Sequence, residues 1–495
     1  MRTPASPAEQ PAAGAEQSGH DAATLFVAAA FGLYVALGLI GAGGRLLAIA
    51  FPLGFFGLAL LAYARDPATY LGVVVWSWLV TPFVRRVFDM HYGFHPTSTI
   101  LLAPLLASIL SIFTVLRRAR MLRSTAYAPF LVATAALTYA FLIGVIRQSA
   151  AAATYDLLTW IAPIAFGLHL ALEWRRFPRF RTTISSCALW GVLLTALYGI
   201  YQFVSPPLWD RAWVVSAEMA SVGNPTPFVI RVFSTLNAPG PYSVFLIFGL
   251  LIGLASPQRW RAIVLALGLV VFILCKTRSA WGAFVLGALV MQLRQPLRSL
   301  PRQWVALVAV FLLAAPIITT PRVMSVLTHR AASLRDVRND NSFQTRVNFT
   351  RYALASMSSN PAGSGLGALG GAGKLLTGSN GGFALDSGPL EIYSVMGWLG
   401  GTLFMLSLLA ILLPIVRSRR VRFEPITSAA VSVVVAVMFT SIFGNIFNSV
   451  SGFFFWCAVG LATSGRSYAQ AVDMMQRFGN RPDILAQLTL RRPAA

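Results

Sequence analysis

The chain has 495 residues, of which 56% are hydrophobic and only 11% are charged, and its mean hydropathy is +0.69. The apolar residues come in runs of about 18–22, long enough to cross the hydrocarbon core of a bilayer, which excludes a soluble globular protein. The net charge of +23 does not indicate nucleic-acid binding, because the basic residues are spread along the chain in short clusters between the apolar runs.

In chain order, residues 1–23 are rich in Ala, Pro, Glu and Gln, which predicts a disordered cytoplasmic tail. The rest predicts an all-α polytopic membrane protein. We expect about fourteen transmembrane helices, near 24–42, 46–64, 68–84, 98–116, 126–146, 155–172, 182–204, 239–256, 260–275, 279–293, 303–320, 388–415, 427–444 and 449–464.

Four arginine-rich clusters set the expected topology. They lie at 117–123, 173–181, 294–302 and 417–422, and an even number of predicted helices separates every pair of them. Because basic clusters favour the cytoplasmic side, this spacing predicts that all four clusters and both termini are cytoplasmic.

The same topology divides the chain into segments. It predicts two outside loops: a shorter one at 205–238 and a large one at 321–387, whose mixed basic helical and glycine-rich pattern favours a partly helical cap. The expected helical segments are 24–204, 239–320 with an outside hairpin at Arg278, and 388–464. Residues 465–495 form a basic cytoplasmic tail.

Neither a disulfide framework nor a metal site is expected. Cys187, Cys275 and Cys457 are far apart in sequence and fall in or beside apolar segments. His91 and His95 are too isolated to indicate a metal site, and no cofactor is predicted.

Arginines on the outside oppose the usual charge bias and need another explanation. The guanidinium fork suits phosphate and carboxylate groups, whereas an arginine at a helix end can also reach the membrane surface without any functional role. Asp89 is interpreted as an ion-pair partner for one of the two nearest arginines. The outside set is Arg85, Arg86, Arg211, Arg231, Arg278, Arg322, Arg330, Arg335, Arg338, Arg346 and Arg351.

Arg278 is the sharpest candidate for anion binding. It lies with Lys276 in "CKTRSAWGAF", a short connection between two predicted spans, where two cations precede a helix start. Arg231 comes shortly before another span. Arg346 and Arg351 lie in a predicted helix of the large loop. Two or three such arginines match the charge of a lipid-linked diphosphate.

Asp386 and Glu391 stand at the start of the apolar segment 388–415, in "DSGPLEIYSVMGWLGG". Carboxylates there stabilise the positive end of a helix dipole, and Pro389 suits a first helical turn, so helix capping is one interpretation. A chemical role is the other. The glycines of this segment suit helix packing equally well.

Four segments in order resemble the bacterial O-antigen ligase and Wzy-type polymerase superfamily of membrane glycosyltransferases. The third lies in the large loop, and the fourth keeps the family's spacing of nine residues between Ser387 and Gly397, with Gly400 following. The segments are "RVFSTLNAPGPYSVFL", "KTRSAWGAFVLG", "RVNFTRYALASMSSNPAGSGLG" and "DSGPLEIYSVMGWLGG".

The resemblance implies a metal-independent enzyme of the bacterial inner membrane, without nucleotide, that acts at the periplasmic face. It would transfer a glycan from an undecaprenyl-diphosphate carrier to an acceptor sugar hydroxyl. The family's histidine is replaced by Asp386, which we expect to act as the base. Arg231 and Arg278 would stabilise the leaving diphosphate, and Arg346, Arg351, Lys276 and Glu391 are weaker substrate-binding candidates.

The missing histidine favours a polymerase of lipid-linked repeats into an exopolysaccharide or O-antigen, with an acceptor glycan, membrane lipids and a chain-length regulator as candidate partners. A ligase that transfers glycan to lipid A core is the alternative. A lipid-linked oligosaccharide transporter is the rival of another class, although no repeat relates 24–204 to 239–464 as transporters often show.

Overall fold

The computed structural model describes residues 27–41, 44–294, 350–351, 354–355, 357–377, 387–418 and 424–478. Asp386, Arg346, the expected span 303–320 and both chain ends lie outside these residues. Within the described ranges the regular structure is entirely helical, which confirms the expected all-α class.

The helices follow one another with short connections, and an apolar helix at Val27–Leu39 precedes them. They are α2 (Leu47–Arg65), α3 (Pro67–Tyr92), α4 (Leu102–Ile109), α5 (Ile112–Arg117), α6 (Ala119–Leu122), α7 (Ala128–Arg147), α8 (Ala150–Leu172), α9 (Phe177–Val204), α10 (Leu208–Ser216), α11 (Pro239–Ala255), α12 (Arg261–Leu274), α13 (Arg278–Arg294), α17 (Gly370–Thr377), α18 (Gly388–Arg417), α19 (Pro425–Thr440) and α20 (Ser449–Phe478).

Among the described residues, 8 helical segments are long and apolar enough to cross a membrane. The polytopic membrane class is therefore confirmed. Every expected span that lies in the described ranges coincides with a helix, but the number of about fourteen spans stays a prediction, as does the large periplasmic loop. Some helices extend beyond the predicted span ends: α3 continues to Tyr92 and α20 to Phe478, and α9 begins at Phe177.

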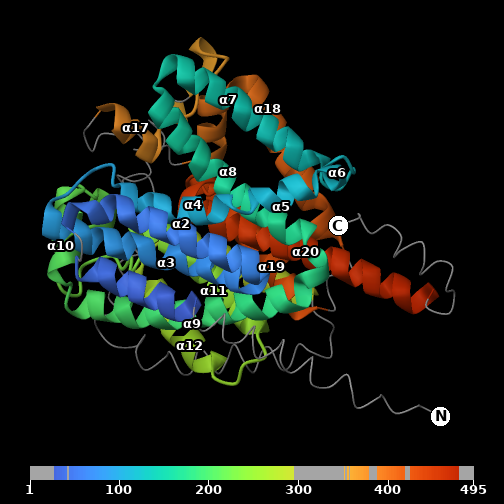
Figure 1. Ribbon diagram of the computed structural model, residues 1–495, viewed down its shortest axis with the longest axis horizontal. Coiled ribbons are helices and arrows are strands. Elements are labelled where there is room, and N and C mark those ends of the chain that lie inside the picture. Colours follow the sequence, from blue (N-terminus) through green and yellow to red (C-terminus); the bar gives the residue numbers. More distant parts are fainter. Residues whose placement is uncertain are drawn as a thin grey trace.

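In Figure 1, α7, α8 and α18 gather at the upper end of the view, above a body that includes α2, α3, α9 and α11. The helices α8 and α20 pack together at small residues. A Cβ atom added to Gly167 of α8 would lie 2.5 Å from the carbonyl oxygen of Trp456, and one added to Gly460 would meet the backbone of Gly167. Such close backbone approach is how helices associate in membranes.

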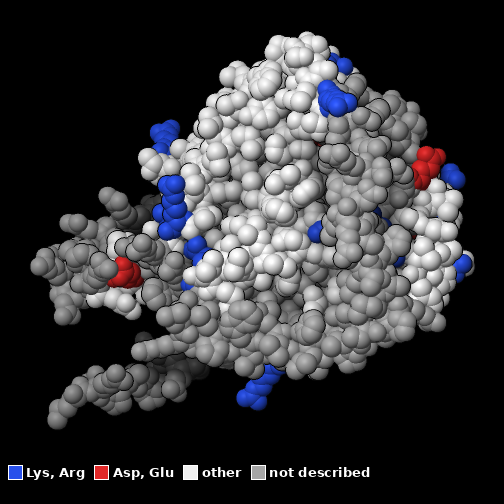
Figure 2. All heavy atoms as spheres, turned by 180° about the vertical axis from the view of Figure 1, so that it is seen from behind, with Lys and Arg blue, Asp and Glu red and all other residues white. Residues whose placement is uncertain are grey.

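The opposite face of the molecule is mainly uncharged. Figure 2 shows lysine and arginine side chains mostly toward the margins of that face, with white atoms over most of the described surface between them. Many large apolar side chains on the outer helices are exposed, including Ile49, Ile146 and Leu194. This distribution fits a surface in contact with lipid.

Candidate functional site

The segment 230–238, which leads into α11, is held in place by a buried polar network of side chains from α9 and α10. Gln202 of α9 accepts hydrogen bonds from the backbone N–H groups of Phe233 (3.0 Å) and Ser234 (2.9 Å). Its amide nitrogen donates to Asp210 of α10, at 2.5 Å. The network allows Ser234 to hold a left-handed backbone, with φ +52°, inside an apolar bundle.

Arg86 completes this network. Its guanidinium forms an ion pair with Asp210 and donates to the carbonyl oxygens of Leu236 (2.7 Å) and Ser234 (2.5 Å). It also lies over the ring of Phe233, 4.8 Å from the centroid. The side chain of Arg86 is fully buried. This arginine, which was expected on the outside, therefore holds the segment 230–238 in place and is not exposed to a substrate.

The neighbouring arginine has a similar internal role. Arg85 pairs with Asp89 one helical turn away, at 3.2 Å, and donates to the carbonyl oxygen of His95 at 2.7 Å. The expected ion pair of Asp89 is thus confirmed, with Arg85 as the partner.

Arg231 reaches from the segment 230–238 to the connection between α12 and α13. Its guanidinium donates to the carbonyl oxygens of Ser221 (2.7 Å), Cys275 (3.2 Å) and Lys276 (3.4 Å). In return, Lys276 donates from Nζ to the carbonyl oxygen of Val229, at 2.8 Å, and has φ +55°.

The structure therefore brings together three predicted site residues. Arg231 contacts the backbone of Lys276 directly, and Arg278, two residues further on, is the first residue of α13. All three side chains are partly accessible to solvent. They concentrate positive charge at the start of a helix, an arrangement suited to an anion.

The glycine-rich segment 360–367 lies between α7 and α18. The backbone N–H groups of Ser364 and Gly365 donate to the carbonyl oxygens of Ser394 and Val395 in α18, and that of Leu366 donates to Ala140 in α7. The bonds are 2.8–2.9 Å long. The segment 360–367, expected to belong to a large loop, is thus bonded to two helices of the bundle.

The fit of this segment requires a break in α18. Gly397 has φ +66° and ψ −175°, and an added Cβ would clash with the backbone of Ala362. The N–H of Trp398 turns to the carbonyl oxygen of Pro361, at 2.9 Å, instead of continuing the helix. Gly397 thus allows a loop to approach α18 closely, which differs from the helix-to-helix packing expected for the glycines of this segment.

Arg147, the last residue of α7, was not among the predicted outside arginines. Its NH1 group donates to the side-chain oxygen of Asn360 and to the carbonyl oxygen of Gly363, each at 2.6 Å. Because Arg147 closes an apolar run, the sequence suggested no more than a helix end. Its position opposite the Asn-Pro-Ala-Gly turn shows that it fixes the segment 360–367.

Two buried carboxylates lie behind the same segment. Asp156 of α8, also missed in the sequence, accepts a hydrogen bond from the N–H of Gly367 at 2.8 Å. Glu391 accepts one from the side-chain amide of Asn445, at 2.6 Å, in the connection between α19 and α20. Glu391 thus ties two segments together, and its substrate-binding role stays a prediction. Arg351 is exposed.

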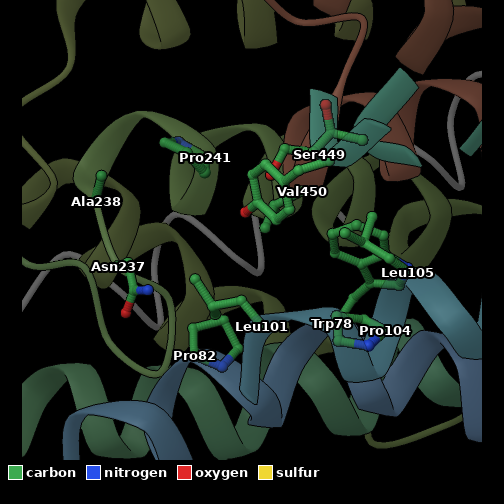
Figure 3. A pocket seen from close by; sticks show the side chains of 12 residues that line it. Trp78, Pro82, Leu101, Pro104, Leu105, Asn237, Ala238, Pro241, Ser449 and Val450 are labelled. Atoms are coloured by element: carbon green, nitrogen blue, oxygen red, sulfur yellow. The ribbon is translucent and has the colours of Figure 1, made fainter. Parts of the chain in front are cut away.

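A cavity of about 150 Å³ opens beside the segment 230–238 (Figure 3). Its walls are mostly apolar and come from α3, α4, α8, α11 and α20. Asn237 and Ala238 bring the Asn-Ala-Pro-Gly-Pro turn to its edge, and within the described structure the side-chain oxygen of Asn237 is buried without a hydrogen-bond partner. The lining residues are Trp78, Pro82, Leu101, Pro104, Leu105, Tyr155, Thr159, Asn237, Ala238, Pro241, Ser449 and Val450.

The cationic connection and the interrupted helix both fall in a segment with known relatives. Residues 262–405 match the family model Wzy_C, described as O-antigen ligase. The resemblance to the O-antigen ligase and Wzy-type superfamily is confirmed. The matched segment contains Lys276, Arg278, Glu391 and Gly397, while Arg231 reaches it from outside. A comparison with curated proteins found no match.

The structure brings the four segments that resemble this family into contact as two pairs. The first contacts the second through Arg231, and the third contacts the fourth through the backbone of Gly363, which lies against Gly397. The spacing between Ser387 and Gly397 sets the distance from the start of α18 to its break. Asp386 and Arg346 lie outside the described residues.

Proposed function

We propose that the protein is a membrane glycosyltransferase that joins undecaprenyl-diphosphate-linked repeats into a polysaccharide at the periplasmic face. The observation that carries this proposal is the convergence of Arg231, Lys276 and the α13 start at Arg278, within or beside a segment that matches the O-antigen ligase model. A lipid-linked diphosphate is the anion that such proteins encounter at a membrane surface.

In the proposed reaction, the acceptor hydroxyl oxygen forms a bond to the anomeric carbon of the donor glycan. The bond from that carbon to the diphosphate oxygen breaks, and the diphosphate leaves with the electron pair. Arg231 and Arg278 stabilise the charge that builds on the leaving group. The hydroxyl proton passes to the carboxylate of Asp386. This happens late in the transfer, because the hydroxyl becomes acidic only as its oxygen bonds to the anomeric carbon.

The rest of the described site positions these groups. The network of Arg86, Asp210 and Gln202 fixes the segment that carries Arg231. The beginning of α18 at Gly388, two residues after Asp386, packs against the connection between α19 and α20, since an added Cβ there would lie 3.1 Å from the carbonyl oxygens of Ser441 and Gly444. A base held next to a rigid helix start can be oriented toward an acceptor hydroxyl.

Two other functions make different use of the same cations. A ligase would transfer the glycan to a lipid A core instead of a second repeat, and a transporter would bind the diphosphate without breaking a bond. The match of residues 262–405 to the O-antigen ligase model, and the lack of any repeat relating 24–204 to 239–464, favour transfer over alternating access.

The test replaces Arg278 with alanine in cells that depend on this protein for polymer formation. We expect R278A to abolish the polymer while the protein level and the export of lipid-linked repeats stay normal. Arg259, an exposed arginine between α11 and α12, is the matched control, and R259A should leave the polymer unchanged. Polymer of normal length in R278A would overturn the diphosphate role.

A further inference from the structure

A second cationic cavity lies at the other end of α3 and α9. Its volume is about 510 Å³, and its walls come from the connection between α2 and α3 and from the connection between α8 and α9. From Pro67, the first residue of α3, to Arg86 is about 28 Å along the helix, so this cavity is far from the segment 230–238. The lining residues are Arg65, Asp66, Pro67, Ala68, Arg175, Arg176, Pro178, Arg179 and Phe180.

Four arginines from the end of α2, the connection between α8 and α9, and the first turn of α9 line this cavity, together with one carboxylate. All four are exposed to solvent: Arg65, Arg175, Arg176 and Arg179. The side chain of Arg179 is 72% accessible and lies 3.8 Å from Asp66, while that of Arg176 is 48% accessible. Donors this accessible can turn toward a ligand in the cavity.

The nearby carboxylates are already engaged. Oδ2 of Asp66 accepts hydrogen bonds from both the N–H and the hydroxyl of Thr69, at 2.9 Å each, as the cap of α3. Glu173 pairs with Arg118 at 2.8 Å and with Arg176 at 3.4 Å. The cavity therefore keeps an excess of positive charge.

The starts of two long helices add to this potential. Both α3, with 26 residues, and α9, with 28, begin at the cavity with a proline in the first turn. The partial positive charge of a helix start favours an anion, and several arginines close together repel one another unless an anion lies between them.

The cavity lies where a lipid headgroup would be. It is at the ends of α2, α3 and α9, which are all long and apolar enough to cross a membrane. Arg175 lies over the ring of Trp174, 5.3 Å from the centroid, and tryptophan is enriched at membrane surfaces. The helix that ends at Arg65 exposes apolar side chains along its length, at Ile49, Leu53 and Leu60.

We infer that this cavity binds the phosphodiester headgroup of an anionic membrane lipid, with the acyl chains along the exposed apolar surface of the adjoining helices. The arginine fork supplies paired donors to phosphate oxygens. Free inorganic phosphate has the same chemistry, but it gains nothing from the apolar surface beside the cavity.

The experiment measures lipid retention by the full-length protein. Delipidated protein in detergent is mixed with phosphatidylglycerol or with phosphatidylcholine, and native mass spectrometry gives the fraction that keeps one lipid. We expect the wild type to retain phosphatidylglycerol preferentially. The double variant R175Q/R179Q should reduce its affinity by about tenfold, since each basic residue near an anionic headgroup contributes several-fold.

Two further variants make the result specific. R259Q changes an exposed arginine outside the cavity and should retain phosphatidylglycerol like the wild type. R175K/R179K keeps the charge and should recover most of the retention, which separates a lost site from a misfolded protein. Unchanged retention in R175Q/R179Q would overturn the inference. Displacement of the lipid by low millimolar inorganic phosphate would identify the free anion as the ligand and overturn the lipid assignment.

Discussion

Arg86 and Asp210 form an ion pair in which neither side chain is accessible to solvent, with Nε and Oδ1 3.2 Å apart. The two residues come from α3 and α10 and are 124 positions apart. Both have other partners, because Arg86 donates to two carbonyl oxygens and Asp210 accepts from Tyr198 at 2.8 Å and from Gln202 at 2.5 Å. The pair joins the segment before α11 to the helices beneath it.

The first prediction follows from this pair. D210N keeps the shape of the side chain but leaves the charge of Arg86 buried without a carboxylate, which typically costs about 3–5 kcal/mol. We expect purified D210N to have a lower midpoint of thermal unfolding than the wild type, as measured by tryptophan fluorescence. E218Q, at an exposed acidic residue of the same connection, should unfold like the wild type. Equal midpoints for D210N and the wild type would show that the pair adds no stability.

The second prediction concerns Gly397. Its φ of +66° and the backbone of Ala362 beside it leave no room for a side chain. G397A should therefore lose roughly 1–3 kcal/mol from backbone strain alone, with a further loss from the clash. Gly57 is the matched control, because an added Cβ there meets nothing within 4 Å. If G397A were as stable as G57A in the same unfolding assay, the close approach of the loop to α18 would be wrong.

Arg147 gives the third prediction. Arg147 donates hydrogen bonds to Asn360 and Gly363, and without them the segment 360–367 should open more often. Backbone amides of this segment should therefore exchange hydrogen faster in R147A than in the wild type, while those of α9 exchange as before. Hydrogen–deuterium exchange with mass spectrometry measures both regions in one sample. R123A, at an exposed arginine before α7, serves as the control. Equal exchange in R147A and the wild type would remove Arg147 from the support of this segment.

The fourth prediction separates the two interpretations of Asp386. Asparagine caps a helix well but cannot accept the hydroxyl proton as a base. We expect D386N to lose polymer formation at normal protein levels, and D386H, which carries the residue that the family has there, to keep part of it. Full activity in D386N would leave capping as the role of Asp386.

Local spacing made part of this structure predictable. Arg85 and Asp89 are four residues apart in a helix, so their pairing follows from the helical repeat. The apolar runs predicted the helices because nearly every residue of a span must be apolar. The family resemblance gave Arg231 and Arg278 a common role, Lys276 lies two residues before Arg278, and the structure brings the three together.

The partners that are remote in sequence could not be found in this way. Asp156 and Gly367 are 211 positions apart, and a lone aspartate in an apolar run does not indicate which backbone N–H it accepts from. In the sequence, Arg86 could not be told apart from the other arginines expected on the outside. Only the burial of its side chain in the structure shows that it does not face a substrate. Arg147 was overlooked because a basic residue at a helix end already has an ordinary explanation.

The backbone hydrogen bonds between the segment 360–367 and the part of α18 around Gly397 have an evolutionary consequence. The carbonyl oxygens of Ser394 and Val395 accept from the segment 360–367, and the N–H of Trp398 donates to it. A chimera that took either piece from a distant relative would leave these main-chain groups without partners inside an apolar bundle, at a cost of about 1–3 kcal/mol each. The glycine-rich segment and the interrupted helix therefore have to be inherited together.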